Sequence, residues 1–191
     1  MGKRNLGASA LHFCINGSGP SGTISGTALQ DTHSFEGLPE MLVLADELLD
    51  KIGRPQKSLA EREGFDGTRK TYVSYVGNPK LYHTADEILA SFGEAATFDV
   101  LFQMRKHGTW QGMVFGADGA RLGNFASEIG LIEIILGPEA ATGLGVQDGF
   151  TIRLHGGENE TWQGTVTEDA SGRTKAFRSA LELAKQMHSA G

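Results

Sequence analysis

The sequence predicts an α+β protein: an antiparallel sheet built from tandem ββα repeats, with helices packed on one face. Two observations predict this fold. A segment of alternating apolar and polar residues occurs twice in the C-terminal half, and each copy is followed by apolar residues spaced three and four apart. Alternation indicates a half-buried strand, whereas the wider spacing indicates a helix with one buried face. Antiparallel strands covered on one side by helices form a layered α+β architecture.

The repeat appears when FDVLFQMRKHGTWQG (98–112) is compared with FTIRLHGGENETWQG (150–164). The two segments begin 52 residues apart, and Trp110 and Trp162 are separated by the same 52 residues. Within each segment the polar, glycine-bearing stretches RKHG and HGGENE predict the turn between two strands. The matched spacing indicates an internal duplication.

Each copy continues into a helix-like segment. Thirteen residues beyond the glycine of each TWQG stands a phenylalanine, Phe125 or Phe177, which opens the pattern F-x-S. We expect Ser127 and Ser179 to cap the first turns of the two helices. The stretches ADGARLG and EDASGRT are interpreted as connections between the second strand and the helix.

A degenerate third copy is predicted at the front of the chain. In LHFCINGSGPSGTISG (11–26), Ile24 and Gly26 are matched to the tryptophan and the final glycine of TWQG. Phe35 then opens a helix-like segment, nine residues after Gly26 rather than thirteen, which implies a shorter connection.

The predicted organisation is an N-terminal unit with an insertion (1–94), followed by the tandem pair (95–191), in one continuous fold. The insertion begins near residue 54 with a polar stretch that predicts a loop. TYVSYV (71–76) predicts a short strand, and Thr84 is expected to cap a short helix.

Composition narrows the classes of partner. The formal charge is −6, from 17 Lys and Arg against 23 Asp and Glu, and the basic residues are scattered. Nucleic-acid binding is therefore not expected. No apolar run is long enough to span a bilayer, and the first residues lack the apolar core of a signal peptide, so no membrane association is expected. A single cysteine, Cys14, favours a reducing, cytoplasmic location.

Two groups of residues are candidate binding sites. Gly17, Gly19 and Gly22 match G-x-G-x-x-G, but a strand-like segment follows where a dinucleotide site needs a helix. A hairpin turn is the favoured interpretation, and an anion-binding backbone nest is the alternative.

The second group is the repeated Trp-Gln pair, Trp110 with Gln111 and Trp162 with Gln163. The favoured interpretation packs each tryptophan beneath its helix, with the glutamine facing water. The alternative is a shared surface for protein or sugar contacts.

No catalytic or metal-binding signature is found. The six histidines show no tight ligand spacing, and surface or capping roles are expected for them. Cys14 is interpreted as a small buried side chain rather than a nucleophile. We therefore name no catalytic residue, metal or cofactor.

The segments TWQGTV and AFRSALELAKQM together resemble a set of uncharacterised bacterial proteins in which S/T-W-Q-G-T-V precedes F-R-S-A-L-E-L. FEGLPEMLVLADELLDKIGRPQ also looks like the front part of those proteins. The resemblance implies a bacterial origin. It carries no activity.

Three functional hypotheses follow. The first is a non-enzymatic, inhibitor-like binding protein that engages a protein partner, or itself as a homo-oligomer, through a sheet face or edge. The second is a protein that binds a small molecule, such as an anion or a nucleotide, between repeats or subunits. The third is an enzyme whose reaction the sequence does not name.

Overall fold

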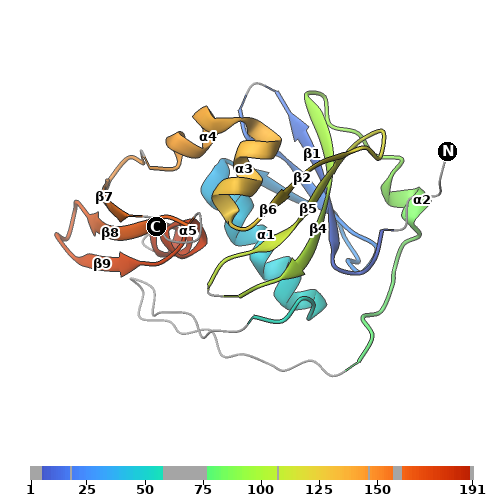
Figure 1. Cartoon of the computed structure of the whole chain (residues 1–191), viewed down its shortest axis with the longest axis horizontal. Helices are drawn as coiled ribbons and strands as arrows, with labels where there is room; N and C mark the ends of the chain where they lie inside the picture. Colours follow the sequence, from blue (N-terminus) through green and yellow to red (C-terminus); the bar gives the residue numbers. More distant parts are fainter. Residues whose placement is uncertain are drawn as a thin grey trace.

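A computed structural model describes residues 6–17, 19–57, 77–106, 108–145, 147–156 and 161–189. The protein has a mixed α+β fold with two antiparallel sheets (Figure 1). The predicted strand 71–76 lies outside the described residues.

The elements fall into three groups, each with three strands and then a helix. The first is β1 (Ala10–Asn16), β2 (Ser21–Ser25), β3 (His33–Glu36) and α1 (Leu38–Ile52). The second is β4 (Ala96–Met104), β5 (Gln111–Gly116), β6 (Arg121–Phe125) and α3 (Glu128–Leu136). The third is β7 (Phe150–Gly156), β8 (Gln163–Glu168), β9 (Thr174–Phe177) and α5 (Ala180–His188). Two short helices, α2 (Ala85–Ile88) and α4 (Pro138–Gly143), lie between the groups.

The predicted unit was therefore one strand short. β6 begins within ADGARLG and takes up its last three residues, and β9 begins at the last residue of EDASGRT, so each strand starts inside a segment that was interpreted as a connection between the second strand and the helix. Only the last residue of each strand, Phe125 or Phe177, is buried. Since the other residues are exposed or only half-buried, neither strand shows the alternation by which a half-buried strand is recognised.

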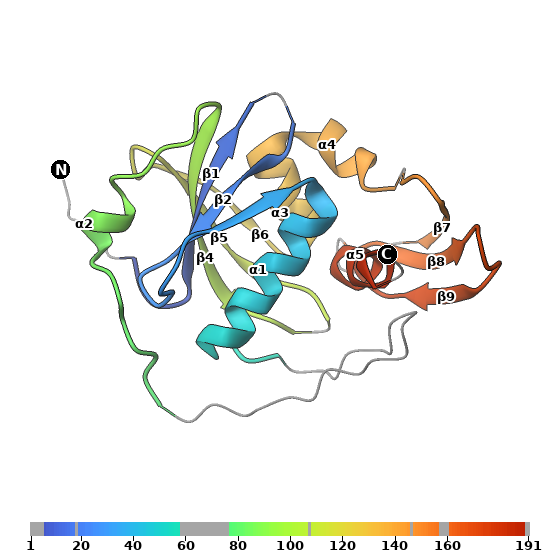
Figure 2. The same cartoon turned by 180° about the vertical axis from the view of Figure 1, so that it is seen from behind.

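Strands of the first two groups form one six-stranded sheet in the order β3-β2-β1-β4-β5-β6, so pairing crosses the boundary predicted near residue 94. The third group forms a separate sheet, β7-β8-β9. Helices α1 and α3 pack on one side of the larger sheet, here called the inner face. The short α2 lies across the opposite, outer face (Figure 1). The smaller sheet lies at the far end of the molecule from α2 in both views (Figure 2).

One continuous core joins the inner face to the three long helices. Leu11, Phe13 and Val100 from the strands are fully buried against Leu42 of α1 and Leu131 of α3, among others. The apolar stripe predicted for the last helix is confirmed, since all five of its residues are buried: Phe177, Ala180, Leu181, Ala184 and Met187.

The predicted helix caps are also confirmed. The Ser127 hydroxyl accepts a hydrogen bond from Gly130 N (3.2 Å), and the Ser179 hydroxyl accepts one from Glu182 N (3.1 Å). Thr84 caps α2 in a capping box with Glu87.

The strand register corrects the alignment of the first unit. Gly112 lies opposite Phe125 and Gly164 opposite Phe177, and in the first unit it is Gly22, not Gly26, that lies opposite Phe35. With Gly22 as the match, the spacing from glycine to phenylalanine is 13 residues in all three units. Ile24 therefore does not correspond to Trp110, and the shortened part is the β1–β2 turn.

The three glycines share a steric requirement. A Cβ atom on Gly22, Gly112 or Gly164 would lie 2.0, 2.1 or 2.0 Å from a carbonyl oxygen of the neighbouring strand. On Gly112 it would also lie 2.6 Å from the Phe125 ring. Only glycine fits there without displacing the backbone.

In the described residues, no helix has both the length and the apolar character that crossing a bilayer demands.

We predict that Gly112→Ala lowers the free energy of unfolding by about 2–3 kcal/mol, because the added methyl overpacks the strand pair and the phenylalanine ring. Gly19→Ala is the matched control, since nothing lies within 4 Å of its Cβ position. Chemical denaturation followed by circular dichroism measures both. Equal unfolding midpoints for the two variants would contradict the steric requirement.

Candidate functional site

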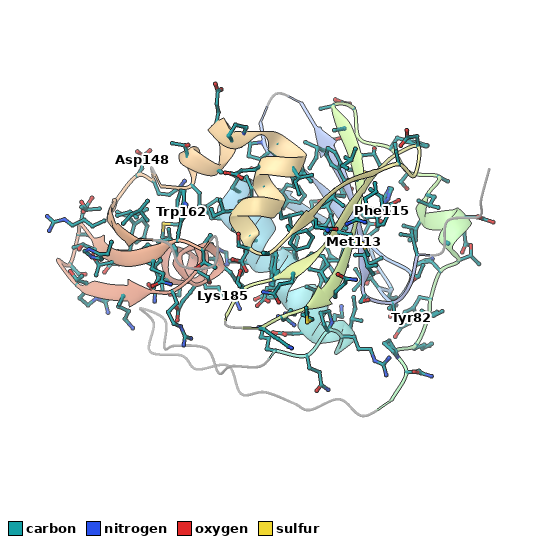
Figure 3. All side chains as sticks on the ribbon, in the orientation of Figure 1. Tyr82, Met113, Phe115, Asp148, Trp162 and Lys185 are labelled. Carbon is teal, nitrogen blue, oxygen red and sulfur yellow. The ribbon has the colours of Figure 1, made fainter. Side chains whose placement is uncertain are left out.

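The densest group of charges in the described structure surrounds Asp46 of α1, whose side chain is completely buried. Its carboxylate contacts Arg105 just beyond β4 and Lys185 of α5. It also accepts hydrogen bonds from Lys57 (2.6 Å) and from the indole N–H of Trp110 (3.2 Å). One carboxylate thus connects all three units. Figure 3 shows Lys185 on the C-terminal helix.

A second acidic residue completes this cluster. Asp50, one helical turn after Asp46, accepts hydrogen bonds from Arg105 (2.7 Å) and Lys57 (2.7 Å). Arg105 further donates to the main-chain oxygens of Asp46 and Pro55, at 3.3 Å each. These five side chains are the buried charge cluster: Asp46, Asp50, Lys57, Arg105 and Lys185.

The cations determine the charge state of Asp46. Burial by itself would raise its pKa, but Lys185, Arg105 and Lys57 together hold the pKa below the usual 3.8. The carboxylate is therefore ionised throughout the physiological range. Its contribution to stability is present above the unfolded-state pKa and is lost as the pH falls below it.

The charge of Asp46 acts on Glu128, the first residue of α3. It is fully buried; its Oε2 accepts a hydrogen bond from the Thr109 hydroxyl (2.8 Å), whereas its Oε1 has no partner among the described groups. Burial raises the pKa of Glu128 from 4.5 to about 7, and the negative charge of Asp46 adds to the increase. This carboxyl therefore titrates near neutrality inside the protein.

The repeated tryptophans occupy different environments. Trp110 is 1% exposed, packs edge-on against Phe102 at 5.2 Å between ring centroids, and donates to Asp46. Trp162 is half-buried on the edge of the core, with its ring 3.4 Å from the Cβ position of Gly145 (Figure 3). In this conformation the Trp110 ring cannot stack on a ligand at the surface.

The glutamines are half-buried. Gln111 donates to the main-chain oxygens of Lys106 (3.3 Å) and Ala126 (3.4 Å) and accepts from Lys106 N (3.2 Å). It thereby links the hairpin turn to the start of α3. Gln163 has the equivalent position as the first residue of β8.

The three candidate glycines do not gather at a helix. Gly17, with φ of 67°, and Gly19 lie in the exposed β1–β2 turn, and Gly22 lies within β2. A strand, rather than a helix, follows the motif, as the hairpin interpretation expects.

His12 departs from the surface role that was expected for the histidines. It is 2% exposed on the outer face, with Nδ1 2.7 Å from Asp99 Oδ1 and Nε2 3.0 Å from the main-chain oxygen of Ser91. Both ring nitrogens thus lie within hydrogen-bonding distance of an oxygen from another segment. This contact ties residue 91 to the sheet.

Cys14 is buried two residues along the same strand from His12. Burial raises the pKa of its thiol, which disfavours the reactive thiolate. In the part of the chain that the structure describes, no group of three or more His, Cys, Asp or Glu side chains is placed to hold a metal ion.

The buried charge cluster was missed from the sequence because its members are spread over 139 residues, from Asp46 to Lys185. One signal was available. Asp46 directly follows Ala45 of the apolar stripe of α1 and puts a charge on the otherwise apolar face of that helix. A charged residue at such a position usually has an ionic partner. Chemically, the cluster joins α1 to the segment after β4 and to α5.

We predict that Asp46→Asn destabilises the fold by about 3–5 kcal/mol, because it leaves buried cations without their shared anion. Asp50→Asn is the control: it breaks contacts to the same Arg105 and Lys57, but its side chain is 33% exposed, so water can replace the carboxylate. Denaturant unfolding at neutral pH compares the two. Similar losses for both variants would show that the position of Asp46 has no special role.

We also predict a pH dependence that originates at Glu128. Because the folded-state pKa, about 7, lies above the unfolded value of 4.5, the folded state binds the proton more tightly. The associated stability is full below about pH 4.5 and falls by roughly 3 kcal/mol as the pH rises to about 7.

This fall should disappear in Glu128→Gln and persist in Glu133→Gln, which changes an exposed residue of the same helix. The measurement is the free energy of unfolding of the three chains between pH 5 and pH 8. Parallel curves for all three would refute the assignment.

Comparisons with protein-family models, with curated proteins and with solved structures give no match for this chain. The resemblance to uncharacterised bacterial proteins therefore stays a prediction, and a function has to be argued from geometry.

Proposed function

We propose that this chain is a non-enzymatic binding protein that engages a protein partner through the outer face of its six-stranded sheet. The observation that carries the proposal is a group of apolar side chains on that face. Leu101 of β4 and Met113 and Phe115 of β5 are each half-buried, although they lie on the side of the sheet away from α1 and α3. Met113 and Phe115 are labelled in Figure 3.

These side chains are neighbours in the sheet. Leu101 lies opposite Met113 in the β4–β5 register, and Phe115 lies two residues beyond Met113 on the same face. In contrast, the inward positions of β5 are Gly112, Val114 and Gly116, all of which are buried. These three positions are therefore apolar without being covered to the same extent as the core.

The segment that contains α2, residues 77–95, covers part of the outer face. Ile88 packs with Leu6 and Ala10, and Leu101 of β4 packs against the same cluster. Earlier in this segment, Tyr82 N donates to Thr27 O at 2.8 Å, and at its end Ala95 N donates to Ile15 O at 2.9 Å.

The same segment adds exposed apolar side chains: Leu81 is 60% exposed, Tyr82 44% and Phe92 68%. Aromatic residues and methionine are enriched where proteins bind one another, since they bury much apolar area. Leu101, Met113 and Phe115 are adjacent on the sheet, and adjacent apolar groups at a protein surface often mark an interaction site. These properties support a protein partner. The small-molecule and enzyme hypotheses remain predictions, because no geometry described above favours either.

We predict that Phe115→Lys abolishes partner capture while the fold is retained, because a charge at the centre of an apolar contact must be desolvated. The control is Leu154→Lys, which alters an exposed leucine, 51% accessible, on the other sheet. Immobilised full-length chains are exposed to native extract of a bacterium that expresses them, and quantitative mass spectrometry compares the captured proteins.

The expected result is a protein bound by the unmodified chain and by Leu154→Lys but not by Phe115→Lys. Amide hydrogen exchange should then show protection of β4 and β5 in the complex. Capture that survives Phe115→Lys, or no capture above blank resin, would count against the proposal.

A further inference from the structure

We propose that two copies of this chain associate by antiparallel pairing of their β7 strands, with Thr151 of each copy opposite Thr151 of the other. The result would be a six-stranded sheet across a two-fold axis, with strands β9-β8-β7 followed by β7-β8-β9 of the second copy. This inference concerns the smaller sheet and is independent of the outer-face proposal.

The first argument is an edge without a neighbour. In the described residues, β7 pairs with β8 and with no other strand. The corresponding strands of the other two units, β1 and β4, pair with each other at the centre of the six-stranded sheet. Three units in one chain allow one such pair and leave the third unit without a partner. The smaller sheet lies at one end of the molecule (Figure 2).

The hairpin registers define equivalent positions in the three first strands. Ile15 lies opposite Gly22, Phe102 opposite Gly112, and Leu154 opposite Gly164. Each of these glycines precedes a phenylalanine by 13 residues. The residues opposite them, Ile15, Phe102 and Leu154, are therefore equivalent. Counting back three residues makes His12, Asp99 and Thr151 equivalent as well.

The second argument is that the β1–β4 register places equivalent positions of two units opposite each other. His12 lies opposite Asp99, so the same position of two units meets at the centre of the pair. On either side, Leu11 lies opposite Val100 and Phe13 opposite Phe98, which are the same two positions exchanged. A register with this property is what a two-fold axis requires. Applied to β7, it puts Thr151 on the axis and Phe150 opposite Ile152 of the second copy.

The third argument is exposure. Ile15 and Phe102 are 3% and 1% exposed, whereas Leu154 at the equivalent position is 51% exposed. Phe150 and Ile152 are only half-buried. Their equivalents Leu11 and Phe13 in β1 and Val100 in β4 are fully buried, whereas Phe98 in β4 is half-buried like Phe150. The helix-facing side of β7 is therefore less covered than that of β1 and β4, above all at Leu154.

The main-chain groups are oriented for the same pairing. Gly149 O accepts from Asp169 N, on the β8 side, so by strand alternation the groups of Phe150 and Ile152 point to the open edge. In the paired units, Phe102 N, which is equivalent to Leu154 N, donates across to Ser9 O. Phe150 N has a 3.3 Å contact with Gln147 O, which pairing would replace.

The test uses cross-linking by introduced cysteines. Thr151 is a position whose own main-chain groups point away from the partner, and such facing residues have Cα atoms about 4.5 Å apart, within disulfide reach. Thr151→Cys should therefore form a disulfide-linked dimer under mild oxidation. The native Cys14 is 5% exposed and does not compete.

The matched control is Arg153→Cys, on the same exposed strand and the same face. In the proposed register it lies opposite Gly149, so its own copy across the axis is four residues away, about 13 Å. That separation excludes a disulfide. Non-reducing gels compare the two variants, and light scattering of the unmodified chain measures its mass as a function of concentration.

The expected result is a twofold mass at high concentration and strong cross-linking of Thr151→Cys alone. Equal cross-linking of both variants, a dimer that Thr151→Cys cannot trap, or a monomer from micromolar to millimolar concentration would overturn the proposal. If Thr151→Cys fails to fold, amide exchange of the unmodified chain decides. The Ile152 and Leu154 amides should exchange more slowly as concentration rises, and concentration-independent exchange would overturn the proposal.

Discussion

The carboxylate of Asp46 is the constraint that fixes how the three units of this protein meet. A buried anion requires compensation, and here the compensation comes from Arg105 in the second unit, Lys185 in the third and Lys57 after α1. Apolar contacts between helices tolerate small shifts, whereas an ion pair inside the core is satisfied only in a narrow range of positions. The apolar core supplies the drive for folding, and the buried charge cluster selects the arrangement. Such a cluster need not add net stability relative to a wholly apolar interface.

The strand geometry, by contrast, is set locally and in the same way in each unit. A glycine opposite a phenylalanine allows close approach of neighbouring strands, and the next helix begins three residues beyond the phenylalanine. The charge cluster shows no such regularity, since Asp46 occurs only in α1. The structure within each unit therefore follows the same pattern, which occurs three times. The contacts between units differ from one pair of units to the next. The differing environments of Trp110 and Trp162 illustrate this, because only Trp110 reaches the carboxylate.

Much of this local pattern could be predicted from the sequence, since it depends on residues close together in the chain. The first two strands of the C-terminal units, the serine caps and the helix stripes all have short-range signals. β6 and β9 could not be recognised, because an edge strand with one buried residue has no periodicity. Gly26 was matched to Gly112 in place of Gly22 because the tryptophan that marks the other copies is absent from the first. The charge cluster and the His12–Asp99 contact depend on pairing between distant segments, which a single sequence does not encode visibly.

Distance along the chain gives the Asp46–Lys185 contact a consequence for biosynthesis. The two residues are 139 positions apart, so α1 leaves the ribosome long before the last of its cationic partners exists. Until then, α1 cannot take its buried position without removing water from the Asp46 carboxylate while the charge of that group is only partly neutralised. The first two units can begin to collapse during translation, but the final seating of α1 has to wait for the C-terminal helix. Premature termination before α5 would release a nascent polypeptide with an exposed apolar helix face, which is the kind of surface that chaperones and proteases recognise.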